Sequence, residues 1–216
     1  MIIENKIPVS SELNKKYNAS SIYEPKLEKN FFEFTLEELG LITGVYHIYG
    51  ANLLIGTINV VALEKAVNKV IQRHSVLRTV FVSENALGYQ KIKPFIDAKN
   101  LDVIDLSNVV DGDQQACLLC QQDAAAAFDL LAGPLYRFKL YRLGAQRQVF
   151  SINFHHLISD GWSQAVLVAD LMAFYDDFCN QRGQVFNDLE LQYHDYARWI
   201  DRQTQLGQFD EHREWW

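Results

Sequence analysis

The chain has 216 residues, of which 49% are hydrophobic and 22% charged, and its net charge is -7. This length and apolar content allow folding without disulfides or metals and exclude an intrinsically disordered protein. An acidic chain is a poor match for nucleic acid, whose binding depends on many cationic contacts to phosphate. The sequence contains no secretory signal and no apolar run near the roughly 18 residues of a membrane span. With three cysteines, these features predict a cytoplasmic protein that binds neither nucleic acid nor membrane.

Regular structure is expected after a polar leader or extended arm over residues 1–30. The clearest element is a helix over residues 59–72, because Leu63, Val67 and Val70 recur on one face and Asn59 can cap its start. The other expected elements are strands 77–82, 89–93 and 101–106, a helix over about 111–128, hairpin strands 135–143 and 148–155, helices 160–178 and 193–205, and a helical stub to 216. This order predicts an α/β fold with a mixed β-sheet flanked by helices.

Two adjacent histidines follow the second hairpin strand. Strand alternation places His156 on the same apolar face as Ile152 and Phe154, and His155 on the opposite face. Burial of His156 would disfavour its charged form and leave a neutral ring that can accept a proton, as general-base catalysis requires. The alternative for a lone buried histidine is a core residue with satisfied hydrogen bonds. Adjacent histidines that point to opposite faces do not form a zinc site, so no metal is expected.

Asp160 and Gly161 lie where the strand gives way to the next helix. Asp160 can cap the first N–H groups of that helix, and Gly161 permits a tight turn and the close approach of a substrate. The helix is expected to pack on the core through one apolar stripe, consisting of Trp162, Ala165, Val166, Ala169, Met172 and Ala173. Rigid elements on both sides would make this loop a well-held place for a catalytic group.

Four segments carry a family resemblance, and they occur in the family's order. They are Arg-His-Ser-Val-Leu-Arg-Thr-Val-Phe (73–81), Phe-Asp-Leu with Gly-Pro-Leu (128–135), His-His-Leu-Ile-Ser-Asp-Gly (155–161) and Tyr-His-Asp-Tyr-Ala-Arg-Trp (193–199). Together they resemble the motifs of condensation domains of nonribosomal peptide synthetases, which belong to the chloramphenicol acetyltransferase-like superfamily. The family's first motif has no convincing match, and residues 34–39 occupy its place.

The resemblance implies an acyltransferase that joins a carrier-bound acyl thioester to a carrier-bound amine and forms an amide. His156 would act as general base or orient the amine, and His155 would support the geometry. Asp160 would form a structural ion pair with Arg73 or Arg78.

The same resemblance suggests roles for the residues that follow Asp160. Gly161 would present its backbone N–H to the acyl group, and Trp162 and Ser163 would line the site. Nothing in the sequence activates Ser163 as a hydrolase nucleophile, because the Gly-x-Ser-x-Gly elbow is absent.

Condensation domains consist of two similar lobes with the site between them, and residues 31–216 resemble the N-terminal lobe alone. The chain ends at residues 214–216, which resemble the boundary before the C-terminal lobe, so the isolated chain is expected to catalyse little. No bound cofactor is expected, because the substrates would arrive on phosphopantetheine arms of carrier domains. The partners would be those carriers and the missing lobe or adjacent synthetase modules. Two alternatives remain: a non-catalytic module that docks a carrier, and an acyltransferase that forms esters from a CoA thioester.

Three further patterns have structural interpretations. Cys117 and Cys120 on a predicted helix are expected to be small buried residues rather than a redox or metal pair. The stripe of Tyr193, Tyr196, Trp199 and Ile200 is expected to face the core. The cations of the hairpin indicate either a carrier-docking patch or a solvated edge strand, and they are Arg137, Lys139, Arg142 and Arg147.

Overall fold

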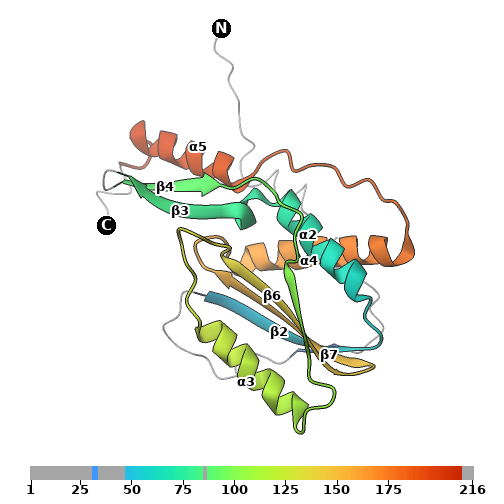
Figure 1. Ribbon diagram of the computed structural model, residues 1–216. Coiled ribbons are helices and arrows are strands. Elements are labelled where there is room, and N and C mark those ends of the chain that lie inside the picture. Colours follow the sequence, from blue (N-terminus) through green and yellow to red (C-terminus); the bar gives the residue numbers. More distant parts are fainter. Residues whose placement is uncertain (1–30, 34–46, 85–86, 211–216) are drawn as a thin grey trace. The chain divides into compact units, whose positions relative to one another are not determined.

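The computed structural model describes residues 31–33, 47–84 and 87–210. The leader expected over residues 1–30, the segment 34–39 and the boundary residues 214–216 lie outside the described residues. Figure 1 shows the arrangement of the described elements. Their centre is a five-stranded sheet in the order β1–β2–β7–β6–β5.

The sheet is mixed. Its strands are β1 (Phe31–Glu33), β2 (His47–Ile55), β7 (Arg147–His155), β6 (Tyr136–Gly144) and β5 (Leu101–Asp105). Neighbouring strands are antiparallel except for β5, which runs parallel to β6. The expected hairpin of β6 and β7 is present and lies inside the sheet.

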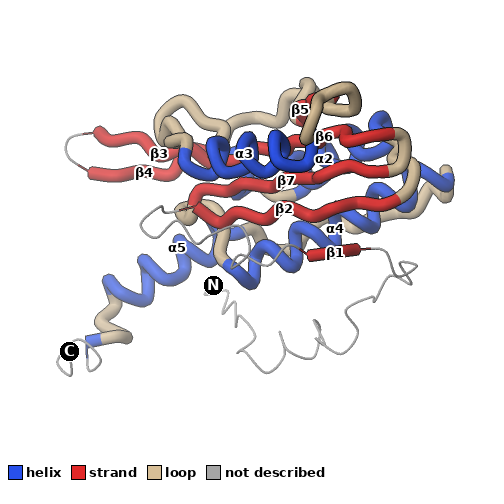
Figure 2. The backbone as a smooth tube through the Cα atoms, turned by 90° about the horizontal axis from the view of Figure 1, so that it is seen from below, coloured by secondary structure: helices blue, strands red, loops and turns tan. Residues whose placement is uncertain are grey.

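Helices cover both faces of the sheet (Figures 1 and 2). Helices α2 (Val60–Arg73) and α4 (Gly161–Asn180) pack on each other on one face, and α3 (Gly112–Ala125) covers the other. The predicted α/β fold with a mixed sheet flanked by helices is therefore confirmed. Within the described part of the chain, no helix combines the length and the apolar character that crossing a membrane requires.

Helix α2 has the cap and the buried apolar face that its sequence predicts. The side chain of Asn59 accepts a hydrogen bond from Ala62 N, which caps the first turn. Its apolar face is buried against the sheet and α4, and it consists of Ala62, Leu63, Ala66, Val67, Val70 and Ile71. Burial of this stripe, more than helix propensity, holds the helix in place.

A two-stranded ribbon lies outside the main sheet, formed by β3 (Thr79–Glu84) and β4 (Leu87–Ile92). It follows a short 3-10 helix, η2 (Ser75–Arg78), in which Leu77 N donates to His74 O. The strand predicted to begin at Leu77 therefore begins at Thr79.

Helix α4 faces the core through a different stripe from the one predicted. Leu167, Leu171 and Phe174 are buried, whereas Trp162 is 71% exposed and Val166 is 43% exposed. The prediction was wrong because apolar residues occur on most sides of this helix, so periodicity alone does not identify the buried side. Packing against α2 and the sheet selects it.

Helix α5 (Tyr193–Gln205) buries none of its residues, so the aromatic stripe predicted as core is also wrong. Tyr193, Tyr196 and Trp199 are exposed and their rings follow one another at about 6 Å, with centroids 6.1 and 5.9 Å apart. Among the described elements, α5 contacts η2. Its apolar face is therefore left open by the described residues.

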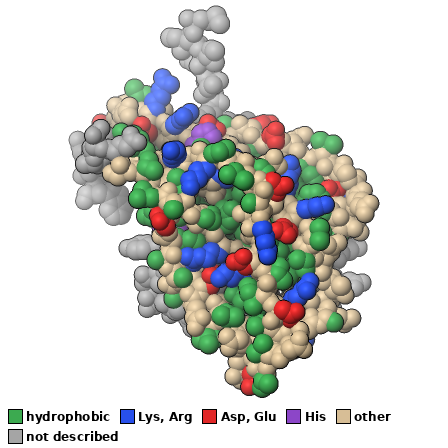
Figure 3. Space-filling model, in the orientation of Figure 1, with side chains coloured by type: hydrophobic (Ala, Val, Ile, Leu, Met, Phe, Trp, Pro, Cys, Tyr) green, Lys and Arg blue, Asp and Glu red, His purple; other side chains and the backbone are tan. Residues whose placement is uncertain are grey.

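The basic side chains of the hairpin do not lie on an edge strand, and they do not form an unpaired patch. Strand β6 lies between β7 and β5, and Lys139 and Arg137 pair with the buried Asp123 of α3. Arg147 pairs with Asp113. On the face shown in Figure 3, basic side chains are interspersed with acidic ones. The solvated-edge interpretation is wrong, and three of the four cations are engaged by carboxylates.

The two cysteines of the C-x-x-C pattern lie on α3, as predicted. Cys120 is buried at 1% exposure and Cys117 is half-buried, and neither forms a disulfide. The interpretation as small packing residues is confirmed for Cys120.

Candidate functional site

The loop between β7 and α4, residues 155–161 (the histidine loop), carries the two adjacent histidines. Its first residue is held by backbone and side chain: His155 N donates to Leu135 O at 2.9 Å, and His155 O accepts from Ile158 N at 3.0 Å. His155 Nδ1 accepts from Leu157 N at 3.0 Å, and the ring meets Phe128 edge-on at 6.1 Å. These contacts fix His155 as the start of a turn.

His156 lies at the tip of this turn and is exposed. The predicted position on the buried apolar face is wrong, because β7 ends at His155 and the chain turns before strand alternation reaches His156. Its imidazole makes no hydrogen bond with the described residues. The ring is therefore presented to its surroundings with no hydrogen bond from the described residues to either nitrogen.

Asp160 closes the other end of the loop as the N-cap of α4. Its Oδ1 accepts from Ser163 N at 2.7 Å and from Ser163 Oγ at 2.6 Å. These two hydrogen bonds hold the pKa of Asp160 below its ordinary value. The predicted cap is confirmed. The histidine loop is thus fixed at both ends, with Ile158 buried between them.

The ion pair predicted for Asp160 is absent, because both candidate arginines have other partners. Arg73 Nε donates to Asp170 Oδ2 at 2.9 Å. Arg78 donates to backbone carbonyls, including Lys93 O at 2.7 Å. Asp160 is satisfied by the helix start, and the arginines are used to hold neighbouring elements.

Asp170 of α4 is the centre of a polar cluster that sequence reasoning missed. Its Oδ2 contacts Arg73 Nε and, at 2.7 Å, His74 Nε2. The three side chains are only 10% to 24% exposed. Burial raises the pKa of Asp170, but the hydrogen bonds and positive charge of His74 and Arg73 outweigh it and leave that pKa below its ordinary value. The cluster ties the end of α2 to the middle of α4.

Gln192 makes a second link to the same segment. Its side chain accepts from Ser75 N at 3.0 Å and donates to Arg73 O at 2.9 Å. Its backbone N–H donates to Asp195 Oδ2, so it also caps α5. Gln192 therefore fixes the start of α5 against η2, and its position just before a predicted helix was the available signal.

The sequence of the chain matches a known family over most of its length. The family model of the condensation domain matches residues 34–216. The chain belongs to the condensation-domain family. Malpinin synthetase of Mortierella alpina is 33% identical over 181 residues, which are 84% of this chain and 2% of that protein. One of the linear gramicidin synthase proteins of Brevibacillus parabrevis is 38% identical over 157 residues, 72% of this chain and 3% of that protein.

The fold agrees with this membership. The crystal structure of the X-domain from teicoplanin biosynthesis matches with a TM-score of 0.67 and 29% identity, covering 76% of this chain and 35% of that chain. This condensation-family chain thus spans a small part of its synthetase relatives and about a third of that solved structure.

The three residues that follow Asp160 are Gly161, Trp162 and Ser163, and each has different surroundings. Ser163 Oγ donates to Asp160, so its hydroxyl is engaged in the cap. Trp162 is largely exposed beside the histidine loop. A Cβ placed on Gly161 would meet no atom within 4 Å, so the turn does not require glycine there. No described residue of this condensation-family chain would clash with a Cβ at position 161.

Proposed function

We propose that this chain is the N-terminal, histidine-bearing lobe of a nonribosomal peptide synthetase condensation domain. The lobe would form an amide between an acyl or aminoacyl thioester on one carrier domain and an amine on another. The observation that supports it is the exposed His156 at the tip of a loop that is fixed at both ends. Such an imidazole can meet a substrate without first breaking a bond to the described residues.

The proposed reaction uses the protein's own groups. The amine nitrogen attacks the thioester carbon, a C–N bond forms, and the C–S bond breaks when the tetrahedral intermediate expels the thiolate. His156 takes the proton that the nitrogen loses and returns it to the departing thiolate, which leaves as a thiol. If His156 instead orients the amine as charge develops, water carries that proton from the nitrogen to the thiolate. An α-amine with a pKa of about 7.7 to 8.0 is partly deprotonated near neutrality. General-base assistance contributes about 10²- to 10⁴-fold in rate, and positioning contributes as well.

Exposed apolar side chains indicate what completes this site. Leu157 in the histidine loop is 47% exposed and Trp162 just after the loop is 71% exposed, and Val166 continues the surface along α4. We infer that the second lobe of a condensation domain covers these side chains and shields His156. The isolated chain is therefore expected to catalyse little or no condensation.

The substrates would be delivered on phosphopantetheine arms, and the partners would be carrier domains and adjacent synthetase modules. The lobe itself would bind no cofactor. His155, through its contacts in the turn, and Asp160, through its cap, would position His156 rather than transfer protons. The three cysteines form no disulfide, which is in keeping with a reducing cytoplasm.

The test supplies the 216-residue chain with a matching second lobe, a carrier-bound acyl thioester and a carrier-bound amine, and detects product by mass spectrometry. Amide formed only when both lobes are present is the expected result. Amide formation by the chain alone would contradict the lobe assignment.

Two other outcomes would each replace the proposal. Ester formation from free acyl-CoA and an alcohol, without reaction of the carrier-bound pair, would identify an ester-forming acyltransferase. Carrier binding without any product would identify a docking module.

A further inference from the structure

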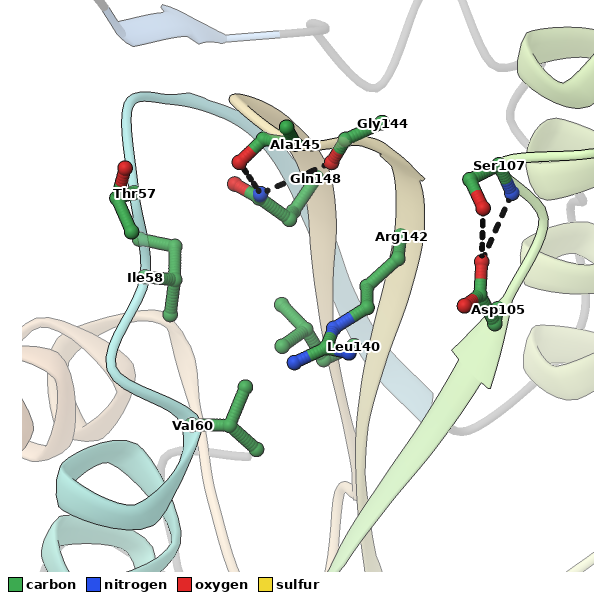
Figure 4. Close-up of a pocket in the computed structure, with 10 residues that line it drawn as sticks. All are labelled: Thr57, Ile58, Val60, Asp105, Ser107, Leu140, Arg142, Gly144, Ala145 and Gln148. Atoms are coloured by element: carbon green, nitrogen blue, oxygen red, sulfur yellow. Dashed lines mark hydrogen bonds between the residues drawn. The ribbon is translucent and has the colours of Figure 1, made fainter.

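A pocket of about 310 Å³ lies at the opposite end of β7 from the histidine loop. It is formed where the sheet extends past the first turn of α2, beside the turn of the β6–β7 hairpin (Figure 4). Gln148 and His155 are seven positions apart along the strand, roughly 23 Å at the usual rise. The pocket is therefore separate from the site proposed for condensation, and its volume suits a small ligand.

Gln148 forms one wall of this pocket and has an unmet hydrogen-bonding group. The residue is 5% exposed, and its Oε1 has no hydrogen-bond partner among the described residues. Its Nε2 donates to Gly144 O and Ala145 O, both at 3.4 Å. An unpaired buried acceptor is costly, and bonds of that length hold the carboxamide weakly. A small rotation of the carboxamide toward the pocket would let a ligand N–H donate to Oε1.

Arg142 lies directly opposite Gln148 on the neighbouring strand. Figure 4 shows its guanidinium directed toward Leu140 and Val60, away from Asp105. The guanidinium makes no hydrogen bond with the described residues. Asp105 accepts two hydrogen bonds from Ser107, and these, with a smaller contribution from the charge of Arg142, hold its pKa below the usual value. Val60, the first residue of α2, also lines the pocket, so the positive end of that helix dipole lies beside it. The pocket therefore offers planar, charged donors to an anion.

Apolar side chains form the remaining wall. Leu140 is fully buried at the base, and Ile58 and Val60 pack beside it. This surface suits an aliphatic group rather than a polyhydroxylated ligand. An anion site, a neutral acceptor and an aliphatic surface thus meet in one small pocket.

We propose that this pocket binds an aliphatic α-amido carboxylate, as in an N-acyl amino acid or the carboxyl-terminal residue of a peptide. The carboxylate pairs with Arg142, the amide N–H donates to Gln148 Oε1, and the aliphatic side chain lies on Leu140 and Ile58. The neutral amide fits better than a free ammonium group, which the guanidinium would repel. This binding does not depend on the proposed condensation activity.

The test titrates N-acetyl-L-leucine into the 216-residue chain and measures binding by calorimetry and NMR. Saturable binding with a Kd of about 1 mM or tighter is expected. Two analogues each lack one group: 4-methylpentanoate lacks the N–H, and N-acetyl-L-leucinamide lacks the anion. Each analogue is expected to bind at least about tenfold more weakly than N-acetyl-L-leucine. A tripeptide ending in leucine distinguishes the two sources, because tighter binding than N-acetyl-L-leucine assigns the pocket to a peptide end and equal binding to a single residue.

Variants locate the binding. Arg142→Gln and Gln148→Met should each weaken N-acetyl-L-leucine about tenfold or more, and Arg147→Gln is the matched control because Arg147 is on the same hairpin but outside the pocket. His156→Ala should bind as the unaltered chain does. The proposal is overturned if no probe binds saturably, or if Arg142→Gln, which alters an exposed side chain and should fold, binds as tightly as the control.

Discussion

The first turn of α4 and the middle of the same helix have opposite surroundings. The first turn carries the exposed Trp162 and follows the loop that carries the exposed His156. In the middle of the helix, Leu171 and Phe174 are buried, and Asp170 pairs with two basic side chains. The buried half fixes the direction and position of the helix. The exposed half then holds Trp162 and the end of the histidine loop at a fixed place, at little cost to the stability of the fold. Variants in the two halves should therefore separate stability from activity.

The largest expected effect on stability is at Leu171. Leu171→Ala would leave a cavity between α4, α2 and the sheet and lower the free energy of unfolding by about 3 kcal/mol. The matched change Val166→Ala, on the exposed side of the same helix, should cost less than about 0.5 kcal/mol. Urea denaturation measures both, and similar losses for the two variants would contradict this orientation of α4.

The Asp170 cluster should be the next most sensitive point. Asp170→Ala leaves Arg73 and His74 without their common partner and should lower the free energy of unfolding by about 2 kcal/mol. Asp176→Ala is the control, since Asp176 pairs with Arg182 at a much more exposed place on α4, and it should cost less than about 0.5 kcal/mol.

The Asp170 effect should depend on pH in one direction. Because the pKa of Asp170 in the folded chain lies below its ordinary value of 3.8, its contribution is fully present above that ordinary value. It is lost as pH falls through the lowered folded pKa, where the carboxylate takes up a proton. The stability difference between the unaltered chain and Asp170→Ala should shrink in acid. A difference that grows as pH falls below 3.8 would contradict the cluster.

Asp160 should have a smaller effect, because its role in the structure is that of a cap. Asp160→Ala removes the acceptor of Ser163 N and should cost about 1 kcal/mol, whereas Asp160→Asn keeps an acceptor and should cost only a few tenths. Thermal unfolding of the two variants measures this. Equal losses for Ala and Asn would favour a charge interaction over the cap.

Gly161 should show the smallest effect on stability. A Cβ there meets nothing within 4 Å, and alanine is the better helix former, so Gly161→Ala should unfold at the same temperature or slightly higher. With the second lobe present, the same variant should form amide more slowly if substrate approaches this backbone. An unchanged rate would remove the proposed role of Gly161 toward the acyl group.

Local sequence patterns predicted the elements of this fold well where one period was clear. The stripe of Leu63, Val67 and Val70 identified α2, and alternation identified both strands of the hairpin. Patterns failed for α4, whose apolar residues surround the helix. They failed for α5 too, whose Tyr193, Tyr196 and Trp199 are left uncovered by the described residues. Amphipathicity identifies a face but not what covers it.

The residues of the candidate site remain a prediction, and their geometry was predicted only in part. The position of His156 required knowing where β7 ends, and that is decided by hydrogen bonds in the turn that follows. The contact of His74 with Asp170 joins residues 96 positions apart, which no local pattern reports. Asp160 was correctly predicted as a cap, whereas its expected ion partner was wrong because Asp170 engages Arg73.

The most direct test of the proposed function is the rate of amide formation by His156→Ala in the presence of the second lobe and both carrier-bound substrates. We predict a fall of about 10²-fold or more, with an unchanged unfolding temperature, because the ring is exposed and makes no hydrogen bond with the described residues. Amide formation at the unaltered rate would show that this imidazole does not carry the chemistry.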